Sequence, residues 1–492
     1  MSRTGTAIGM VVFMGGFASL AYELLAVRLM APYFGTTPAI WTNVIAVVLG
    51  ALALGYAVGG RMAPSTRLLV RVTLAAALLA ALAPPGVVWL APFFLPDGLR
   101  LEDAYPLLSG GSLAASCLLF GPPVFLLGWI APIAIRLQSD ESSTGRVLAL
   151  STLGGLLAVF VINRWLVPQW GSRATLYATS TMLAASSLCL RFTPRSVAGI
   201  GALAVAGLMA PPVNGTMPPA GARITASVET PVQFARVIQF DGDGHRWLQV
   251  NECLDSFQSV QSGEVTSGGL YYDALALAAG LTDASAPRVL ILGLGAGSVV
   301  PSLHAAWQAR VTGIEIDQGL LDLARLQMGL GDLESEGLEV VGGWDARVFL
   351  DRAAGQQAWD VVILDAYRNQ VDIPWTLVSQ EAFKAAHAVL SPGGVLVLNI
   401  AALGPEDPVL TAIASTAGAV FGSAGAYLIR DQRNVLVIAP DRDIRQVSQG
   451  SPLIGTAKRL RRIRPAPGAI LTDDRPILEA LQAASMRRGR KG

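Results

Sequence analysis

Charged residues are scarce in this chain of 492 residues, since Asp, Glu, Lys and Arg together make up only 14% of it. Lysine, cysteine and histidine each occur at only three positions. The cysteines, Cys117, Cys189 and Cys253, lack the spacing of metal ligands, and the histidines are scattered singly. We therefore expect neither a disulfide framework nor a zinc or other metal site.

The few charges are also balanced, with a formal net charge of +1. A balanced chain lacks the basic surplus with which proteins neutralise phosphate backbones, so nucleic acid is not an expected partner. In contrast, 52% of the residues are hydrophobic and the mean hydropathy is +0.50, which is too apolar for a purely soluble protein. The lipid bilayer is therefore an expected partner of part of the chain.

Long apolar stretches are concentrated in residues 1–212. A helix needs about 20 apolar residues to cross a hydrocarbon core, and the candidates lie near 6–30, 40–60, 68–96, 107–135, 147–168, 174–190 and 196–212. The first is too long for a cleaved signal peptide and lacks a clear cleavage site. We predict a multi-pass α-helical membrane domain of about seven spans.

Three local features of this apolar part allow further predictions. Small residues recur over 50–60 and predict close helix packing. The pairs Pro84-Pro85 and Pro122-Pro123 predict kinked or broken helices. Glu23 lies well inside the first stretch, where a carboxylate is costly. It is either a structural group paired with Arg28 or a tyrosine hydroxyl, or a site for a cationic amine.

A segment rich in proline and glycine, 213–222, separates the apolar part from a region of ordinary globular composition. Residues 223–270 are predicted to form a small region of short strands. In 271–445 strands alternate with helices, which predicts a parallel sheet flanked by helices in an α/β Rossmann-like domain. The strands are expected near 288–293, 311–316, 338–341, 360–365 and 394–400, with a closing hairpin at 425–439. Residues 446–492 form a basic C-terminal extension.

The most informative motif is Arg288-Val-Leu-Ile-Leu-Gly-Leu-Gly-Ala-Gly297. It predicts a buried strand that turns through Gly293, Gly295 and Gly297 into a helix, where backbone N–H groups can approach a ligand closely. Glu315 ends the next predicted strand, where an acid can accept hydrogen bonds from ribose hydroxyls. The motif therefore predicts a nucleoside-binding domain.

Two more acids follow the next strands of the same predicted sheet. Asp345 comes after the third strand, and Asp365 ends the fourth. Either acid alone could be only a helix cap or a turn residue. Ligands bind at the carboxyl ends of parallel strands. Three acids there, beside a glycine turn, therefore favour a site.

With these motifs, residues 223–440 resemble the spermidine synthase family of aminopropyltransferases, which has a class I S-adenosylmethionine-dependent methyltransferase-like fold. The whole chain resembles the membrane-fused bacterial members. The resemblance implies decarboxylated S-adenosylmethionine, or S-adenosylmethionine, as co-substrate and a small amine such as putrescine as acceptor. It places the glycines, Glu315, Asp345 and Ala346 against the donor. It makes Asp365 and Tyr272 catalytic, and Tyr367, Gln370 and Asp255 acceptor-binding.

Two departures from the family pattern leave other functions open. The family has an acid in the glycine turn where this chain has Ala296, and a second acid three residues after the catalytic one where this chain has Arg368. A fixed positive charge that pointed inward would repel a polyamine, whereas it could bind a carboxylate or phosphate. The alternatives are a membrane-tethered methyltransferase and a non-catalytic transporter or sensor of polyamines or nucleosides.

The side of the membrane is ambiguous. Arginine clusters place the N-terminus in the cytoplasm by the positive-inside rule, and seven spans would then put the α/β domain outside. The inferred donor is a cytosolic metabolite, so we predict a cytoplasmic domain and suspect that 196–212 does not cross. The arginine-rich composition indicates a bacterial source and hence the inner membrane. A homodimer is a further expected assembly.

Overall fold

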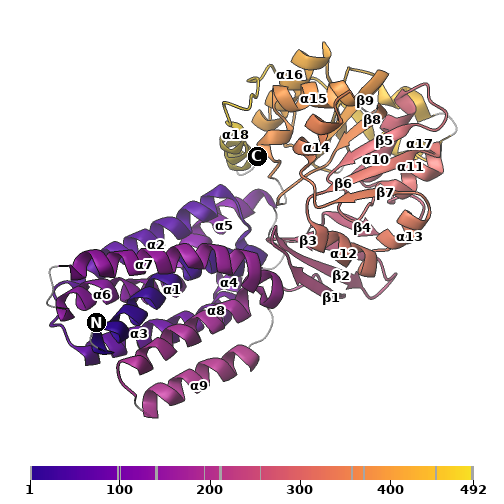
Figure 1. Cartoon of the computed structure of the whole chain (residues 1–492). Helices are drawn as coiled ribbons and strands as arrows, with labels where there is room; N and C mark the ends of the chain where they lie inside the picture. The colour runs from indigo at the N-terminus through magenta and orange to yellow at the C-terminus, as the bar shows by residue number, and fades with distance from the viewer. Residues whose placement is uncertain are drawn as a thin grey trace. The chain divides into compact units, whose positions relative to one another are not determined.

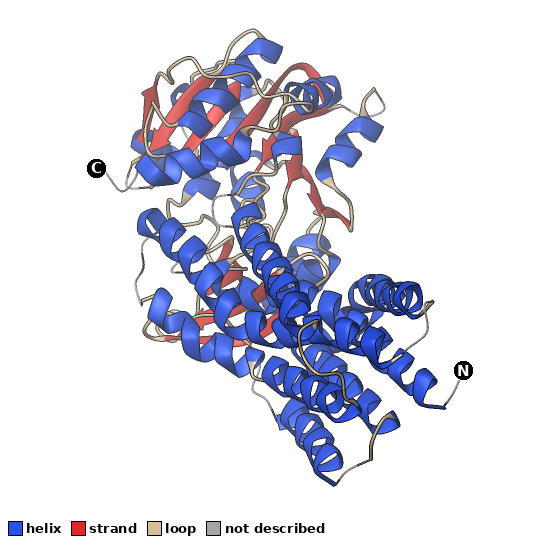
Figure 2. Ribbon diagram, turned by 90° about the vertical axis from the view of Figure 1, so that its left-hand side faces the viewer, coloured by secondary structure: helices blue, strands red, loops and turns tan. Residues whose placement is uncertain are grey.

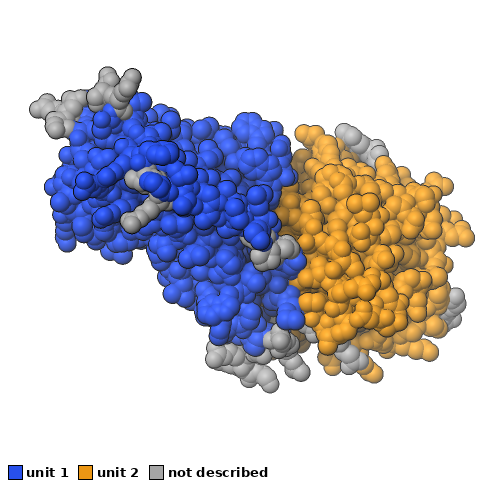
Figure 3. Space-filling model, turned by 90° about the horizontal axis from the view of Figure 1, so that it is seen from below, with its two compact units in different colours: residues 1–217, 251–254 blue, residues 218–250, 255–492 orange. Residues whose placement is uncertain are grey.

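The computed structural model describes residues 3–96, 99, 101–138, 142–192, 194–209, 213–254, 256–355, 358–369, 372–430, 432–448 and 451–488. The chain divides into two compact units, residues 1–217 with 251–254, and residues 218–250 with 255–492 (Figure 3). The boundary lies within the predicted linker 213–222. The short segment 251–254 belongs to the first unit although it follows a strand of the second.

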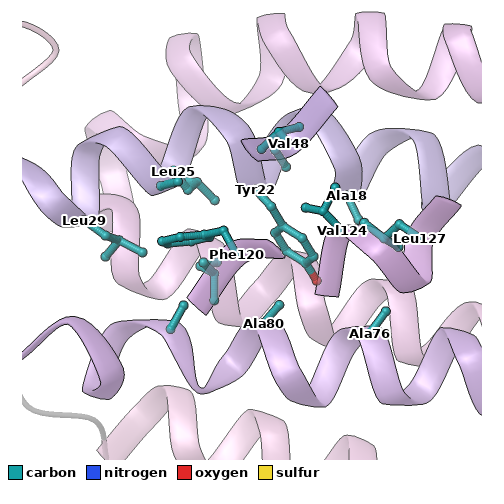
Figure 4. Close-up of a cluster of buried hydrophobic side chains, with 14 of the residues drawn as sticks. Ala18, Tyr22, Leu25, Leu29, Val48, Ala76, Ala80, Phe120, Val124 and Leu127 are labelled. Carbon is teal, nitrogen blue, oxygen red and sulfur yellow. The ribbon is translucent and has the colours of Figure 1, made fainter. Parts of the chain in front are cut away.

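The first unit is entirely helical among its described residues (Figures 1 and 2). Its helices are α1 (Arg3–Phe34), α2 (Pro38–Gly59), α3 (Thr66–Ala81), α4 (Ala83–Phe94), α5 (Leu101–Ala115), the π-helix η1 (Ser116–Phe120), α6 (Gly121–Leu137), α7 (Ser143–Val161), the π-helix η2 (Ile162–Leu166), α8 (Val167–Ser186), η3 (Ser187–Cys189) and α9 (Pro194–Met209). Apolar side chains from these helices form one core, and Figure 4 shows the part of it between α1, α2, α3, η1 and α6.

By length and composition, four helical segments among the described residues could cross a membrane: Thr4–Phe34, Pro38–Gly59, Pro106–Leu137 and Ser143–Cys189. The pair α3 and α4, bent by 47°, would make a fifth. Two predicted stretches fall inside Ser143–Cys189, where the backbone leaves the helical conformation at Gly171 (φ 74°). The stretch 196–212 corresponds to a shorter apolar helix, Val197–Met209. The number of crossings stays a prediction.

The predicted local features of this unit can be compared with the structure. A Cβ on Gly128 of α6 would lie 2.8 Å from the carbonyl oxygen of Leu52 in α2, so the small residues do allow close backbone contact. The proline pairs stand in the first turns of α4 and α6, directly after a bend and a π-helix. The predicted partners of Glu23 are wrong. Among the described residues its carboxylate has no hydrogen-bond or ion-pair partner, and the neighbouring Tyr22 hydroxyl pairs with Ser180 at 2.9 Å.

The second unit contains two sheets. The smaller is an antiparallel meander of β1 (Ala222–Glu229), β2 (Phe234–Phe240), β3 (Arg246–Val250) and β4 (Ser259–Gln261). The larger has the order β12-β10-β11-β9-β8-β5-β6-β7. Its strands are β5 (Arg288–Leu292), β6 (Arg310–Glu315), β7 (Glu339–Gly342), β8 (Trp359–Leu364), β9 (Leu390–Ala401), β10 (Gly425–Ile429), β11 (Asn434–Ala439) and β12 (Leu460–Ile463).

Strand alternation explains why helices cover both faces of the larger sheet. In β5, Val289 and Ile291 pack on one face, and Leu290 and Leu292 on the other. The first face is covered by α10 (Tyr271–Leu277), α11 (Val300–Trp307), α12 (Gln318–Gln327), α13 (Leu330–Ser335) and α17 (Ile454–Arg459). The second is covered by α14 (Ala346–Ala353), α15 (Gln380–Val389), α16 (Pro408–Phe421) and α18 (Leu478–Arg488).

The predicted strand positions agree with the observed ones to within a few residues, and β5 to β9 are parallel to one another as expected. The C-terminal extension differs from the prediction. Its residues 460–463 form β12, which pairs antiparallel with β10 at the edge of the sheet. The extension is therefore part of the folded α/β unit up to the end of α18.

Candidate active site

The strand order reverses between β5 and β8, which are neighbours in the sheet although β6 and β7 separate them in the chain. Ligands of open α/β sheets bind at such a switch point. Gly293 follows β5 and Asp365 follows β8. A Cβ on Gly293 would lie 2.6 Å from the Cα of Ala366, so only glycine permits this approach. The predicted glycine turn and the predicted catalytic acid therefore lie side by side.

The glycine loop has the conformation that its sequence predicts. Gly293, Gly295 and Gly297 all have positive φ, between 57° and 87°. The loop is also held by the small sheet, because the Ala296 N–H donates to Ser259 Oγ at 3.0 Å. On the same strand, Val260 N–H donates to Ser298 Oγ at 2.8 Å. The small β-region thus supports the candidate site directly.

Glu315 ends β6 and is nearly buried, with 8% of its surface exposed. One carboxylate oxygen accepts from Gly295 N–H at 3.0 Å and the other from Asp317 N–H at 3.1 Å. Burial raises its pKa, and these backbone donors oppose the rise. Each carboxylate oxygen can accept a second hydrogen bond. Glu315 is therefore joined to the glycine loop and retains acceptor positions, and its contact with a ribose stays a prediction.

Asp345 is exposed and caps α14, with its Oδ1 accepting from Arg347 N–H at 2.8 Å and Val348 N–H at 3.1 Å. Asp345 therefore acts as a helix cap. Its contact with an adenine stays a prediction, and so does the contact of Ala346 with the donor. Two exposed apolar side chains that no motif indicated stand beside these acids. Ile316 is 46% exposed directly after Glu315, and Trp344 is 36% exposed directly before Asp345. The Arg352 guanidinium lies over the Trp344 ring, 4.9 Å from its centroid.

Asp365 is partly buried at the switch point. Its Oδ1 accepts from Asn399 Nδ2 at 2.8 Å, and the nearby hydroxyl donor of Tyr271 also favours the ionised form. Burial raises the pKa of Asp365 to about 6, against the lowering effect of these two donors. A carboxylate with a pKa near neutrality is suited to accept and release a proton.

Two adjacent tyrosines lie near this acid, and the catalytic role of Tyr272 stays a prediction. The Tyr272 hydroxyl donates to the carbonyl of Gln258 at 2.8 Å, whereas the Tyr271 hydroxyl lowers the pKa of Asp365. The two rings lie 4.0 Å apart between centroids. Burial raises both pKa values well above 10, so both hydroxyls stay protonated. Tyr271 stands beside Tyr272 in the sequence, but adjacency alone could not show which hydroxyl reaches the acid.

Of the three predicted acceptor-binding residues, only Tyr367 lies within the described part of the chain. The Tyr367 hydroxyl donates to the backbone carbonyl of Asn399 at 2.9 Å and accepts from Ala401 N–H at 3.1 Å. It fastens the loop after β8 to the end of β9, and its acceptor role stays a prediction. Gln370 and Asp255 lie outside the described residues.

Arg368, the unexpected basic residue, is exposed. Its charge acts on Asp372, which is 5% exposed and which the sequence analysis did not single out. Burial raises the pKa of Asp372, and Arg368 opposes the rise. Part of the positive charge of Arg368 is thus met by an acid of the chain.

Other charged groups are used within the fold. Arg347 pairs with Asp473 at 2.8 Å and with Asp351 at 3.1 Å. In the basic segment 458–464, Arg459 donates to the carbonyl of Gly269 at 2.9 Å and Arg462 pairs with Asp441. Across the described part of the chain, no group of three or more His, Cys, Asp or Glu residues is arranged to hold a metal ion.

No family model matches the chain, but individual proteins do. A probable polyamine aminopropyl transferase of Bifidobacterium longum is 31% identical over 211 residues, which cover 40% of this chain and 45% of that protein. A polyamine aminopropyltransferase of Vibrio vulnificus is 33% identical over 130 residues, 26% of this chain and 42% of that protein. The α/β unit is thus similar in sequence to polyamine aminopropyltransferases. The chain spans less than half the length of either relative.

Methyltransferases are also similar to the α/β unit. An eEF1A lysine and N-terminal methyltransferase homolog of Drosophila melanogaster is 25% identical over 179 residues, 35% of this chain and 26% of that protein. Among solved structures, a probable spermidine synthase from Corynebacterium glutamicum covers 51% of this chain and 97% of its own length, with 16% identity and a TM-score of 0.39. All of these relatives are named as transferases or synthases.

Proposed function

We propose that this protein transfers an aminopropyl group from a sulfonium nucleoside, decarboxylated S-adenosylmethionine, to a small amine such as putrescine. The observation that carries the proposal is the position of Asp365. It is a carboxylate with a pKa of about 6, at the switch point of a parallel sheet and beside a glycine loop. The similarity to polyamine aminopropyltransferases supports it.

The reaction needs few protein groups. The amine nitrogen forms a bond to the carbon next to the sulfonium, the carbon–sulfur bond breaks, and methylthioadenosine leaves with the electron pair. The attacking amine loses a proton, which Asp365 accepts. Because the sulfonium is already a good leaving group, in-line positioning supplies much of the remaining effect. In this mechanism Glu315 and the glycine loop hold the nucleoside, and Tyr271 or Tyr272 orients the amine.

The deciding experiment is turnover by the purified full-length protein with each donor and a panel of amines. Decarboxylated S-adenosylmethionine should yield methylthioadenosine and an amine longer by one aminopropyl group. S-adenosylmethionine should yield no methylated amine. Mass spectrometry of both products distinguishes the two reactions, and a methylated product alone would replace this proposal by a methyltransferase.

Methyl transfer is the second candidate because methyltransferases are among the relatives and because two expected acids are absent. Ala296 leaves the glycine turn without a carboxylate for the donor's amino group. Arg368 is a cation where a second acid would bind the diamine. An arginine suits a donor or acceptor that keeps a carboxylate, as S-adenosylmethionine does.

The donor site gives the first prediction. Replacing Glu315 by Ala is expected to weaken methylthioadenosine binding by about 1.5–3 kcal/mol, the range for a hydrogen bond to a charged group. Isothermal titration of the full-length protein measures the loss. Glu339→Ala is the matched control, because Glu339 is a carboxylate on the neighbouring strand that bonds Thr312 at 3.1 Å. Equal affinities in wild type and Glu315→Ala would exclude the assigned role.

The membrane location is a further part of the proposal. We propose that the helical unit spans a bacterial inner membrane. Large apolar side chains stand exposed on several of its helices, including Leu54, Trp89, Phe93, Phe160 and Leu208. Exposed apolar surface of this extent suits contact with lipid. The four or five long apolar segments support the same conclusion.

We predict that the α/β unit faces the cytoplasm, where its donor is made. Reporter fusions near residue 215 and at the C-terminus, of a kind active on only one side of the membrane, measure this. Cytoplasm-dependent reporters should be active at both positions. Activity of export-dependent reporters at both would overturn the predicted side and, with it, the supply of the donor.

A further inference from the structure

Two asparagines continue the hydrogen bonding of Asp365 across the sheet. Asn399 Nδ2 donates to Asp365 Oδ1 at 2.8 Å, and Asn434 Nδ2 donates to Asn399 Oδ1 at 2.8 Å. The three residues come from adjacent strands or their ends, because β8 neighbours β9 and β9 neighbours β11. The register brings them together, since Leu364 pairs with Leu398 and Asn434 with Ala401.

The position of Asn399 is unusual for a polar residue. It is 2% exposed, between Leu398 and Ile400, which are both buried in the sheet. A buried amide is costly unless its donors and acceptors are satisfied. Here Tyr367 accepts from Ala401 N–H and donates to the Asn399 carbonyl, so the backbone is held as well. An apolar residue would fill this strand position at lower cost, which indicates a role beyond packing.

The chain of hydrogen bonds has one possible direction at the acid. An ionised carboxylate only accepts, so it requires the NH₂ end of Asn399. An asparagine amide can turn over and exchange its oxygen for its nitrogen. Asn434 opposes this in the orientation described, because its own NH₂ group donates to the Asn399 oxygen. Without Asn434, Asn399 could present its oxygen to Asp365, where two acceptors would repel.

We propose that Asn434 and Asn399 form an amide relay that fixes the orientation of Asp365 and favours its ionised form. Both are positioning residues, which act on the reaction through Asp365. The inference rests on the proposed function for its effect on turnover. Its effect on Asp365 itself can be measured without turnover.

The relay opposes the effect of burial on Asp365. The Asn399 hydrogen bond lowers the pKa of Asp365, whereas burial raises it. Among the described residues, the ionisable groups that face Asp365 are Tyr271, Tyr272 and Tyr367. Burial raises the pKa of all three well above 10, so they stay neutral in the range of the test. Turnover needs the unprotonated acid, so kcat/KM falls as pH falls through this pKa. Loss of the relay should move that fall to higher pH.

The sharpest variant reverses the direction of the relay. Asn434→Asp is nearly isosteric, but its carboxylate accepts from Asn399 and turns the amide oxygen toward Asp365. Asn399→Leu removes the donor completely. In both variants we expect the pH below which kcat/KM falls to rise by roughly one to two units, the worth of a hydrogen bond to a charged group. Thr416→Val removes a buried hydrogen-bonding group on α16 and should leave that pH unchanged.

Infrared titration of the full-length protein supplies the independent measurement. The protonated carboxyl band that disappears in Asp365→Asn belongs to Asp365, and its midpoint should rise in Asn434→Asp. An unmoved midpoint would overturn the relay even if turnover is normal. A raised midpoint in a protein without turnover would support the relay while the proposed function fails. Methylthioadenosine binding shows that each variant is folded. If Asn399→Leu does not fold, the titration midpoint of Asp365 in Asn434→Asp alone tests the relay.

Discussion

Replacing Asp365 by Asn is expected to lower turnover about 10²–10⁴-fold, the usual worth of a general acid or base. Asparagine keeps the size of the side chain and its Oδ1 can still accept from Asn399, but it cannot accept the proton of the attacking amine. The loss should fall on kcat more than on donor affinity, because Glu315 and the glycine loop hold the nucleoside. Steady-state rates with decarboxylated S-adenosylmethionine, together with methylthioadenosine titration, measure both.

The same strand offers a matched control. Asp360 lies near the amino end of β8 and accepts from Arg288 N–H at 2.8 Å and from Ser391 Oγ at 2.7 Å. Asp360→Asn makes the same chemical change away from the switch point and should keep nearly the full rate. If Asp365→Asn turns over as fast as Asp360→Asn, Asp365 is not the base. A wild type that turns over no donor and amine pair would instead reassign the domain as a binding module, in a transporter or sensor.

The two adjacent tyrosines refine the assignment. Tyr271→Phe removes the hydroxyl that lowers the pKa of Asp365, whereas Tyr272→Phe removes one that donates to the Gln258 carbonyl. If a hydroxyl orients the amine at Asp365, Tyr271→Phe should cause the larger loss of turnover. A larger loss in Tyr272→Phe would restore the residue that the family resemblance selects.

Local patterns predicted much of the α/β unit because its strands are short, apolar and bounded by glycines or acids. The run from Arg288 to Gly297 specifies a buried strand and a positive-φ turn without help from distant residues. Asp365 could be placed for the same reason, since an acid that ends a parallel strand must lie at the ligand-binding edge. Family resemblance then added roles that no pattern in the chain contains.

Contacts between distant strands could not be predicted in this way. Asn399 stands within an apolar strand and Asn434 begins another, and only the sheet order brings Asn399 beside Asp365 and Asn434 beside Asn399. The strand β12 was missed because Lys458–Arg464 has the composition of a solvated segment, although its backbone completes the sheet edge. In the helical unit, hydropathy located the apolar stretches. It could not show that two of them are separated by a break at Gly171, where the backbone is not helical.

Replacing Gly293 by Ala is expected to have the largest effect on the stability of the α/β unit. Gly293 has φ of +87°, and a residue with a Cβ would be strained there by about 1–3 kcal/mol. The Cβ would also lie 2.6 Å from Ala366 Cα and 2.7 Å from the Asp365 carbonyl oxygen, both of them backbone atoms. Such overpacking typically costs a further 1–3 kcal/mol. The loop after β8 would have to move, which should impair donor binding and displace Asp365 together.

Gly422→Ala separates these two contributions. Gly422 has φ of +80° at the end of α16, and a Cβ there would meet no atom within 4 Å. Gly422→Ala should therefore lower the stability only through backbone strain. Gly293→Ala should lower it through strain and overpacking together, about twice as much. Thermal unfolding of the full-length variants compares the two, and methylthioadenosine titration reports the site. If both variants unfold at the same temperature and bind the nucleoside equally well, β5 and β8 do not approach as closely as the glycine implies. The nucleoside loop and the proposed base would then be independent of each other.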